Sequence, residues 1–271
     1  MRCFLSVIVL TCHNSGRAYH RHKVEVEELT ANSLLLTKED MTNPEIVPQW
    51  VIEEYKNFHE VVTDRTFPCY FGMTGEKKGE LRYSYISHDN WEHLPQTIQE
   101  FIDLFDVPEG KRLIRHGFFL FVEPEREERS VPHYRDYFWR ILQFLHGEDK
   151  EDWPEDYPED PDHHLWAFSF AGEPFFVFGN APAYKQRKTR DLGNSLVLGF
   201  QPRRIFEGLE GTSKGGIMSR EKVRERVEKW DGLPKHPNIS HYGDPEHREW
   251  KQYFIGDDVE PVEGKCPFHH K

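Results

Sequence analysis

The chain has 271 residues, enough for one large domain or two small ones with a substantial core. Only 37% of the residues are hydrophobic but 14% are aromatic, so we expect a core built mainly on Phe, Tyr and Trp and exclude a wholly disordered chain. The formal net charge of −12 argues against nucleic acid as the main partner, because binding to phosphates needs a basic surface.

Near the N-terminus, Met1 and Arg2 precede a short apolar run, residues 3–12. This run is too short to span a bilayer and is not followed by the small-residue cleavage site of a signal peptide, so we expect no transmembrane segment and a cytoplasmic protein. A lipid-anchored Cys12 is a poorer match. Because Met41 opens a segment with clear helical spacing, we interpret residues 1–40 as a poorly ordered leader or mis-started extension and residues 41–271 as the domain.

Apolar side chains at helical spacing predict three helices in the first half of the chain. They run from Pro48 to Asp64, from Leu94 to Phe105, and from the capping residue Ser130 to Leu145. Two apolar runs, residues 81–86 and 113–122, predict strands.

Two segments between these elements predict irregular structure. The residues from Gly72 to Leu81 are interpreted as a polar turn. Residues 148–162 carry nine acids and one Lys, and a solvated acidic loop is the simplest interpretation.

The most apolar long segment follows this acidic loop and predicts a β-hairpin. Trp166, Phe168 and Phe170 alternate with small residues at the period of two that places one row of side chains on one sheet face. Residues 172–174 interrupt the pattern, and residues 175–178 resume it.

A loop and a concentrated group of positive charge come directly after the hairpin. The basic residues are Lys185, Arg187, Lys188 and Arg190. A wall of aromatic rings that ends at cations suits a flat, apolar ligand with an anionic tail. It equally suits an ordinary core strand that leaves the sheet.

The rest of the chain predicts one more strand and one more helix. Residues 195–200 read as the strand, and a Gly-rich turn, residues 208–216, leads to a helix capped by Ser219. Helices precede and interleave with strands, and no repeat or linker divides the chain. The predicted fold is therefore α/β (α+β), a single domain with a mixed β-sheet flanked by helices.

Several residue types that bear chemistry have two open interpretations. The four cysteines include no CxxC pair, which excludes a secreted disulfide framework and the usual zinc modules. Cys69 follows a proline and Cys266 precedes one, and each is either a buried thiol or a thiolate ligand. The paired histidines His163 and His164 lie at the mouth of the hairpin, where surface imidazoles are the simpler interpretation.

Arginines after two neighbouring strands could converge at one edge of the sheet. Their forked guanidinium groups suit carboxylates and phosphates, and ion pairs to the many acids are the alternative. The four residues are Arg187, Arg190, Arg203 and Arg204. No P-loop, GxGxxG, GxSxG or HExxH motif is present, which removes the easiest enzyme interpretations.

Six short motifs, in this order, resemble the YqcI/YcgG family from about Met41 to Phe268. They are TFPCYFG, FxFxGExFFV followed by PAYxxRxxR, FQPRxxF, HPxxxxYGDxxxxEWKQYF and a terminal CPF. Each motif is weak alone, but their ordered combination is specific. Characterised relatives in that family are heme-dependent N-oxygenases that hydroxylate guanidino nitrogens, in D-cycloserine and in guanitoxin formation.

The resemblance therefore implies heme, dioxygen or peroxide, and a guanidine or amine substrate that is arginine-like. It implies Cys69 as the first candidate for the ligand of the iron, and the alternatives are His164, His236, Tyr184 and Cys266. Tyr184 stands where other members often carry a histidine. A thiolate or imidazole ligand would tune the iron, and a thiolate would favour O–O cleavage.

The resemblance also suggests residues that hold the porphyrin. Trp166 and Phe168 would pack on its face, and Arg187 and Arg190 would pair with its propionates, with Tyr184 and His236 also expected at the cofactor. Two alternatives stay open at this point. One is a heme-binding or redox-responsive module without oxygenase turnover, and the other is a cofactor-free small-molecule-binding protein.

Overall fold

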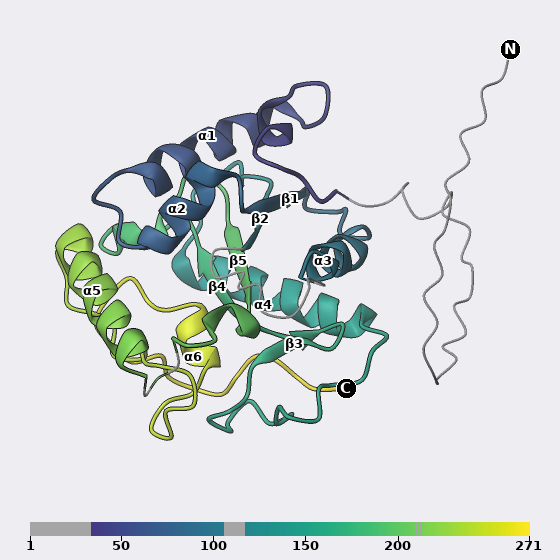
Figure 1. Cartoon of the computed structure of the whole chain (residues 1–271). Helices are drawn as coiled ribbons and strands as arrows, with labels where there is room; N and C mark the ends of the chain where they lie inside the picture. The colour runs from purple at the N-terminus through teal and green to yellow at the C-terminus, as the bar shows by residue number, and fades with distance from the viewer. Residues whose placement is uncertain (1–33, 106–116, 210, 212) are drawn as a thin grey trace, which may run out of the picture. The chain divides into compact units, whose positions relative to one another are not determined.

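The computed structural model describes residues 34–105, 117–209, 211 and 213–271, which belong to one unit, residues 32–271. A five-stranded sheet in the order β1-β2-β5-β4-β3 lies at its centre (Figure 1). β1 and β2 are parallel and the other neighbours are antiparallel, which confirms the predicted mixed sheet. The strands are β1 (Arg82–Ile86), β2 (Phe118–Val122), β3 (Phe168–Phe170), β4 (Glu173–Asn180) and β5 (Val197–Pro202).

Within the described residues, six α-helices flank this sheet, so the predicted α/β class is also confirmed. The parallel pair β1 and β2 needs a crossover connection, and α3 is part of it. The helices are α1 (Gln49–Thr63), α2 (Tyr70–Lys78), α3 (Leu94–Asp103), α4 (Val131–Glu148), α5 (Lys214–Asp231) and α6 (Trp250–Tyr253).

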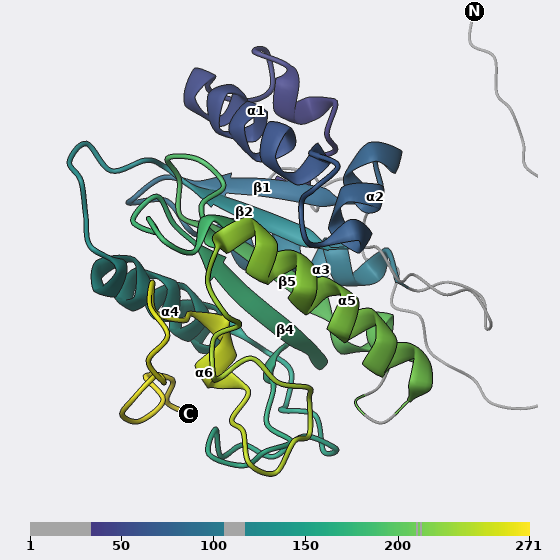
Figure 2. The same cartoon turned by 90° about the vertical axis from the view of Figure 1, so that its left-hand side faces the viewer.

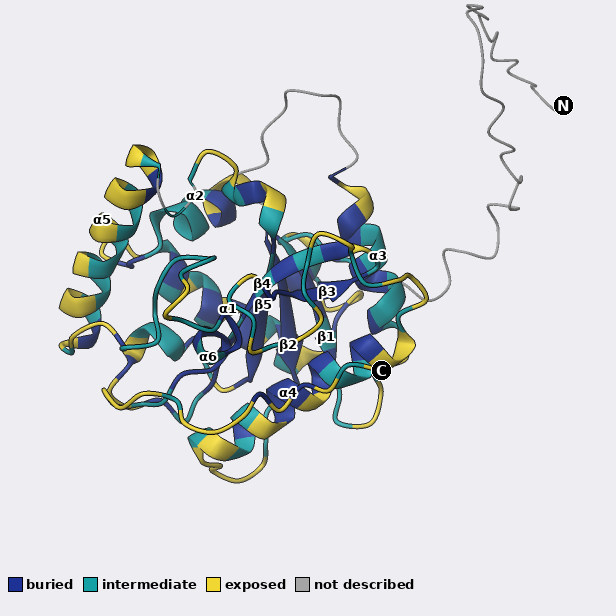
Figure 3. Ribbon diagram, turned by 90° about the horizontal axis from the view of Figure 1, so that it is seen from below, coloured by how far each residue is buried: buried dark blue, intermediate teal, exposed yellow. Residues whose placement is uncertain are grey.

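The side chains of β2 alternate between two hydrophobic clusters, one on each face of the sheet. Phe118 and Leu120 lie in the cluster that includes apolar side chains of α3 and α4. Phe119 and Phe121 lie in the other cluster, which includes the apolar face of α1. All five residues of β2 are buried, as expected for a strand covered on both faces. Figure 3 shows the buried strands inside and the exposed outer faces of the helices.

The predicted β-hairpin is present as β3 and β4. Its turn consists of Ala171 and Gly172, with φ angles of 51° and 71°. Positive φ at both central residues is what a two-residue turn of the tight type I′ class requires, and Gly172 adopts it without strain. The strands therefore turn one residue earlier than the predicted 172–174 interruption.

Two local predictions were wrong. The segment predicted as a polar turn contains most of α2, a helix that Cys69 caps and that Gly79 ends with a left-handed φ of 67°. The last long helix starts at Lys214 with Ser213 as its cap, well before Ser219. Gly residues in the first turns of both helices lower helix propensity, and this hid both starts.

Some predictions fall partly outside the described residues. Residues 113–116 of the second predicted strand are outside them, and so are residues 1–33 of the predicted leader. Inside the described part, Leu36, which precedes the predicted boundary at residue 41, pairs with Tyr83 of β1 and is buried. The leader itself stays a prediction. No helix in the described part of the chain is long and apolar enough to cross a membrane.

Candidate functional site

A cavity of about 290 Å³ lies between one face of the sheet and the helices α2 and α5, and we call it the α2–α5 cavity. Figure 2 shows α5 crossing in front of β4 and β5. The cavity brings together four residues that sequence reasoning placed at a cofactor site, Cys69, Arg187, Arg190 and His236. Most of the remaining wall is apolar, from β2, β4, α5 and the segment before α6.

The aromatic wall of the α2–α5 cavity comes from alternate residues of β4. Phe175 and Val177 are fully buried in the core on the other face, so Phe176 and Phe178 point to the cavity. Their rings stack with centroids 5.8 Å apart. Gly199 on the neighbouring strand makes room for them, because a Cβ there would lie 2.3 Å from the ring of Phe178.

Cys69 lies at the N-terminus of α2, where its Sγ accepts a hydrogen bond from the backbone N–H of Gly72 at 3.3 Å. Gly72 has no Cβ to crowd the sulfur, which a Cβ would approach to 3.3 Å. Burial raises the pKa of the thiol above its ordinary value of 9.0, while the backbone N–H groups of Gly72 and Phe71 act in the opposite direction. A bound metal ion would provide the further stabilisation that a thiolate needs here.

Contacts from α5 hold the segment that leads into Cys69. Arg226 donates from Nε to the carbonyl of Phe67 at 3.2 Å and from Nη2 to the carbonyl of Arg65 at 2.8 Å. Trp230 packs edge-to-face on Phe67 with centroids 5.7 Å apart. These contacts therefore fix α5 to the segment that precedes Cys69.

Arg187 and Arg190 reach the α2–α5 cavity from one loop but differ in their partners. Arg187 is 1% exposed, and it donates to the carbonyls of Asp258 and Pro234 and lies 3.8 Å from Asp231. Among the described residues, the side chain of Arg190 donates to two backbone carbonyls, those of Gly179 at 3.1 Å and Gln252 at 3.4 Å. Burial lowers the pKa of both guanidinium groups, which nevertheless stay charged. The contacts of Arg187 give it a structural role, whereas Arg190 still has N–H donors that could bind a ligand.

His236 is 1% exposed, and its Nδ1 accepts a hydrogen bond from the backbone N–H of Asn238 at 3.2 Å. Its Nε2 is buried without a hydrogen-bond partner among the described residues. Burial, with Arg187 and Arg190 nearby, lowers the pKa of the imidazole from 6.5 to about 4. The neutral ring whose Nδ1 accepts a bond carries its proton on Nε2, so this ring offers an N–H donor.

This lowered pKa predicts a stability that depends on pH. In the unfolded chain the imidazole takes up a proton near pH 6.5, while in the folded chain it does so near pH 4. The contribution of neutral His236 to the free energy of unfolding is therefore fully present above pH 6.5. It falls as the pH drops towards 4, by up to about 3 kcal/mol. Urea unfolding between these pH values measures this loss, and the difference between wild type and His236→Asn isolates it.

The exposed His269 gives a matched control for that prediction. His269→Asn should keep the pH dependence of the wild type, whereas His236→Asn should have a flatter profile. Identical pH profiles for wild type and His236→Asn would contradict the assigned environment of His236.

The other predicted site residues lie elsewhere. Trp166 and Phe168 are fully buried in the core on the opposite face, because that face of the hairpin packs against the core. Tyr184 is also buried, donates to the carbonyl of Ile255 at 2.6 Å, and has its pKa raised by burial. Cys266 is buried in the same core, and burial raises its pKa to about 12. His164 stacks on His163 outside the cavity.

Arg203 and Arg204 do not join Arg187 and Arg190. Arg203 forms an ion pair with the buried Glu249, and Arg204 forms one with Glu173 at the start of β4. Neither lines the α2–α5 cavity. For these two, the alternative of ion pairs with acids is the one that the structure shows.

Sequence reasoning missed Phe176, Phe178 and Asp231 as cavity residues. The alternation in residues 175–178 was visible, but it does not say which face of the strand meets a cavity. Asp231 ends α5 and accepts hydrogen bonds from the backbone and the hydroxyl of Thr189, at 2.8 and 3.0 Å. No sequence pattern connects it to a residue 42 positions earlier.

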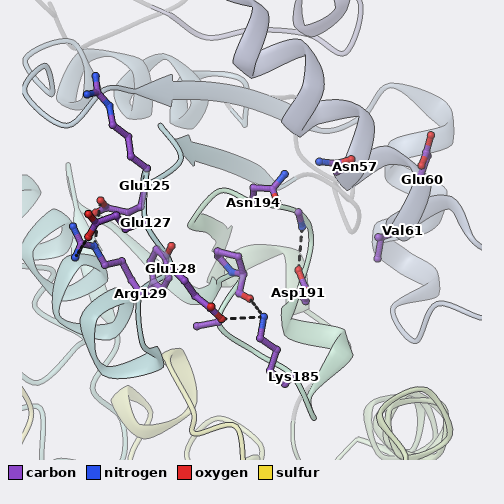
Figure 4. A pocket seen from close by; sticks show the side chains of 15 residues that line it. Asn57, Glu60, Val61, Glu125, Glu127, Glu128, Arg129, Lys185, Asp191 and Asn194 are labelled. Atoms are coloured by element: carbon purple, nitrogen blue, oxygen red, sulfur yellow. Dashed lines mark hydrogen bonds and ion pairs between the residues drawn. The ribbon is translucent and has the colours of Figure 1, made fainter.

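A larger hollow of about 660 Å³ lies at the surface near the start of α4 (Figure 4). Its charged side chains largely neutralise one another, as where Lys185 lies 3.7 Å from Glu128 and Arg129 lies 3.4 Å from Glu127. These four side chains are well exposed. None of its described lining residues has a buried polar side-chain atom without a partner, as His236 has in the α2–α5 cavity, so we take the smaller cavity as the candidate site.

Comparison with known proteins identifies similar chains. A sequence profile of the YqcI/YcgG family matches residues 58–269. YqcI and YcgG of Bacillus subtilis strain 168 are 33% and 35% identical to this chain, covering 86% and 83% of it and 94% and 90% of their own lengths. DcsA of Streptomyces lavendulae, named as a candidate N(omega)-hydroxy-L-arginine synthase, is 25% identical over 96% of this chain and 98% of its own length. No solved structure matches the chain.

Proposed function

Because this chain belongs to the YqcI/YcgG family, as its motifs predict, we propose that it binds heme in the α2–α5 cavity and N-hydroxylates a guanidine or amine. The name of the relative DcsA supports N-hydroxylation. The observation that carries the heme assignment is the joint presence of a cysteine thiol, an aromatic wall and cations around one cavity.

The donors in the cavity fit a heme. Cys69 would hold the iron through Sγ, and the N–H of Gly72 that already points to this sulfur would stabilise the thiolate. His236 is the other candidate ligand in the cavity, but the proton on its Nε2 leaves no lone pair there for a metal. Phe176 and Phe178 supply apolar surface, and Arg190 supplies a cation for a carboxylate.

Heme bound in this cavity would supply the oxidising chemistry. In the overall reaction, one N–H of the substrate becomes N–OH. With hydrogen peroxide the second oxygen atom leaves as water, and with dioxygen the same outcome needs an external donor of two electrons. The protein's contribution is to hold the cofactor, exclude water with the α5 wall and position the substrate nitrogen.

Product analysis tests the proposal. The full chain, expressed with heme supplied, is incubated with L-arginine and with other guanidines and amines, with peroxide or with dioxygen and a reductant. We expect mass spectrometry to detect a product with one added oxygen atom, which the Cys69→Ala variant does not form. Heme binding without product from any of these substrates would instead indicate a redox-responsive module.

A cofactor-free small-molecule binder is the second candidate function. The cavity volume of about 290 Å³ lies at the lower end of the range for small-molecule sites, about 300–1,000 Å³. This volume favours a ligand smaller than a heme. A chain that binds no heme under any of these conditions would support this second function over the first.

A further inference from the structure

The charges around the α2–α5 cavity are opposite in sign to those of the whole chain. The chain carries a net charge of −12. Among the described residues that line the cavity, Asp231 is the one acid, and its oxygens are already occupied by Thr189 and Arg187. The cavity is lined by four cationic side chains, Arg187, Arg190, Arg224 and Lys235. Such a balance favours a negatively charged group of a ligand.

Arg190 has donors available to bind that group. Its two printed hydrogen bonds go to backbone carbonyls, and a guanidinium has five N–H donors, so donors remain. No ion pair joins it to a carboxylate in the described part of the chain. Its Cζ lies 5.9 Å from the ring centroid of Phe178, which keeps the guanidinium against the aromatic wall of the cavity.

His236 presents a second donor to the same cavity. The ring is 1% exposed, and its Nε2 has no hydrogen-bond partner among the described residues. The backbone of Glu260 lies near enough to act against the lowering of the pKa of the ring, but it forms no hydrogen bond to Nε2 by geometry. A buried N–H without a partner destabilises the folded chain, and a bound acceptor would remove this cost.

We propose that the guanidinium of Arg190 and the Nε2–H of His236 form a subsite that binds a carboxylate of the cavity's ligand. This deepens the proposed function and rests on it only for the identity of the ligand. Two sources carry the same chemistry, a propionate of the porphyrin and the carboxylate of an amino-acid substrate. Arg187 takes no part, because its donors are held by Asp258, Pro234 and Asp231.

Acetate is the probe for the subsite, and the titration is carried out without heme. The ¹⁵N resonances of the histidine side chains of the full chain are followed by NMR while acetate is added at constant ionic strength, with chloride as the reference anion. We expect the Nε2 signal of His236 to shift and saturate with acetate and not with chloride. No shift, or an equal shift with chloride, would overturn the proposal.

Variants of Arg190 test its share in the subsite. Arg190→Gln should raise the apparent dissociation constant of acetate by about tenfold or more, and Arg190→Lys should restore part of the binding because it keeps the charge. Arg248→Gln is the matched control, since Arg248 is bound to backbone carbonyls away from the cavity. If Arg190→Gln fails to fold, the Arg190→Lys variant still tests the proposal. If this variant binds acetate with the affinity of the wild type and shows the same acetate-induced shift of the His236 Nε2 signal, the guanidinium fork has no role.

Competition identifies the source of the carboxylate. Zinc protoporphyrin should displace acetate when the group is a propionate, and its dimethyl ester should not. L-Arginine should displace acetate when the group belongs to the substrate, and agmatine, which lacks the carboxylate, should not. If acetate saturates the site but none of these compounds displaces it, the subsite stands and the proposed function fails.

Discussion

Replacing Glu76 with alanine is expected to lower the free energy of unfolding by about 3–5 kcal/mol. Glu76 on α2 is fully buried and accepts hydrogen bonds from Tyr55 and Tyr83, with the Tyr55 hydroxyl at 2.6 Å. His59 Nδ1 also lies 2.6 Å from the same carboxylate. Removing the carboxylate takes the charged acceptor away from two buried hydroxyls and removes the hydrogen bonds that join α2 to α1 and β1.

Urea unfolding measures this loss. Glu76→Gln should lower the free energy of unfolding by less than Glu76→Ala, because the amide oxygen can still accept one of the hydrogen bonds. It should still destabilise the protein, because the amide NH₂ group cannot accept the other. Glu60→Ala is the matched control, since Glu60 on α1 is 64% exposed and lies 4.0 Å from Lys56, so its loss should change stability by less than about 1 kcal/mol. A Glu76→Ala variant within about 1 kcal/mol of the wild type would show that this carboxylate does not anchor α2.

A tryptophan at position 227 is expected to weaken hemin binding by about tenfold or more without unfolding the protein. Val227 lies on the face of α5 that lines the α2–α5 cavity, so the indole of Val227→Trp would enter space that a ligand needs. Because the new ring fills an existing cavity, the cost of overpacking should stay at about 1–3 kcal/mol or below. Hemin titration followed by absorbance gives the affinity, and thermal unfolding gives the stability.

Glu225→Trp on the exposed side of α5 is the control for this prediction. It adds the same indole to the same helix two positions away, so it should bind hemin as the wild type does. Equal hemin affinity in Val227→Trp and in the wild type would place the ligand outside the α2–α5 cavity.

Much of the fold follows from local patterns in the sequence. The period of two in β3 and β4 and the helical spacing in α1, α3 and α4 are strong signals, because each element buries one regular face. α2 has no such signal. It is short, contains Gly72 and Gly75, and depends on Cys69 as its cap and on the buried Glu76, which are interactions that only the folded chain provides.

The candidate site was predictable in part for the same reason. Motif resemblance indicated Cys69, Arg187, Arg190 and His236, and the structure brings them to one cavity. Trp166 and Phe168 show the same aromatic alternation as Phe176 and Phe178, so the sequence does not tell which pair faces a cavity. That depends on how α5 packs against the sheet. The partners that separate the roles of Arg187 and Arg190 lie 47 to 71 residues further along the chain, beyond any local pattern.

Hemin titration of the purified full chain is the measurement that tests the central claim most directly, namely that the α2–α5 cavity holds heme through Cys69. The wild type should give a saturable Soret band, with the strongly red-shifted band of a thiolate-bound iron after reduction and addition of carbon monoxide. Cys69→Ala should lose that thiolate spectrum, while Cys266→Ala keeps it. A wild type without a saturable Soret band, or a Cys69→Ala spectrum identical to that of the wild type, would contradict the claim.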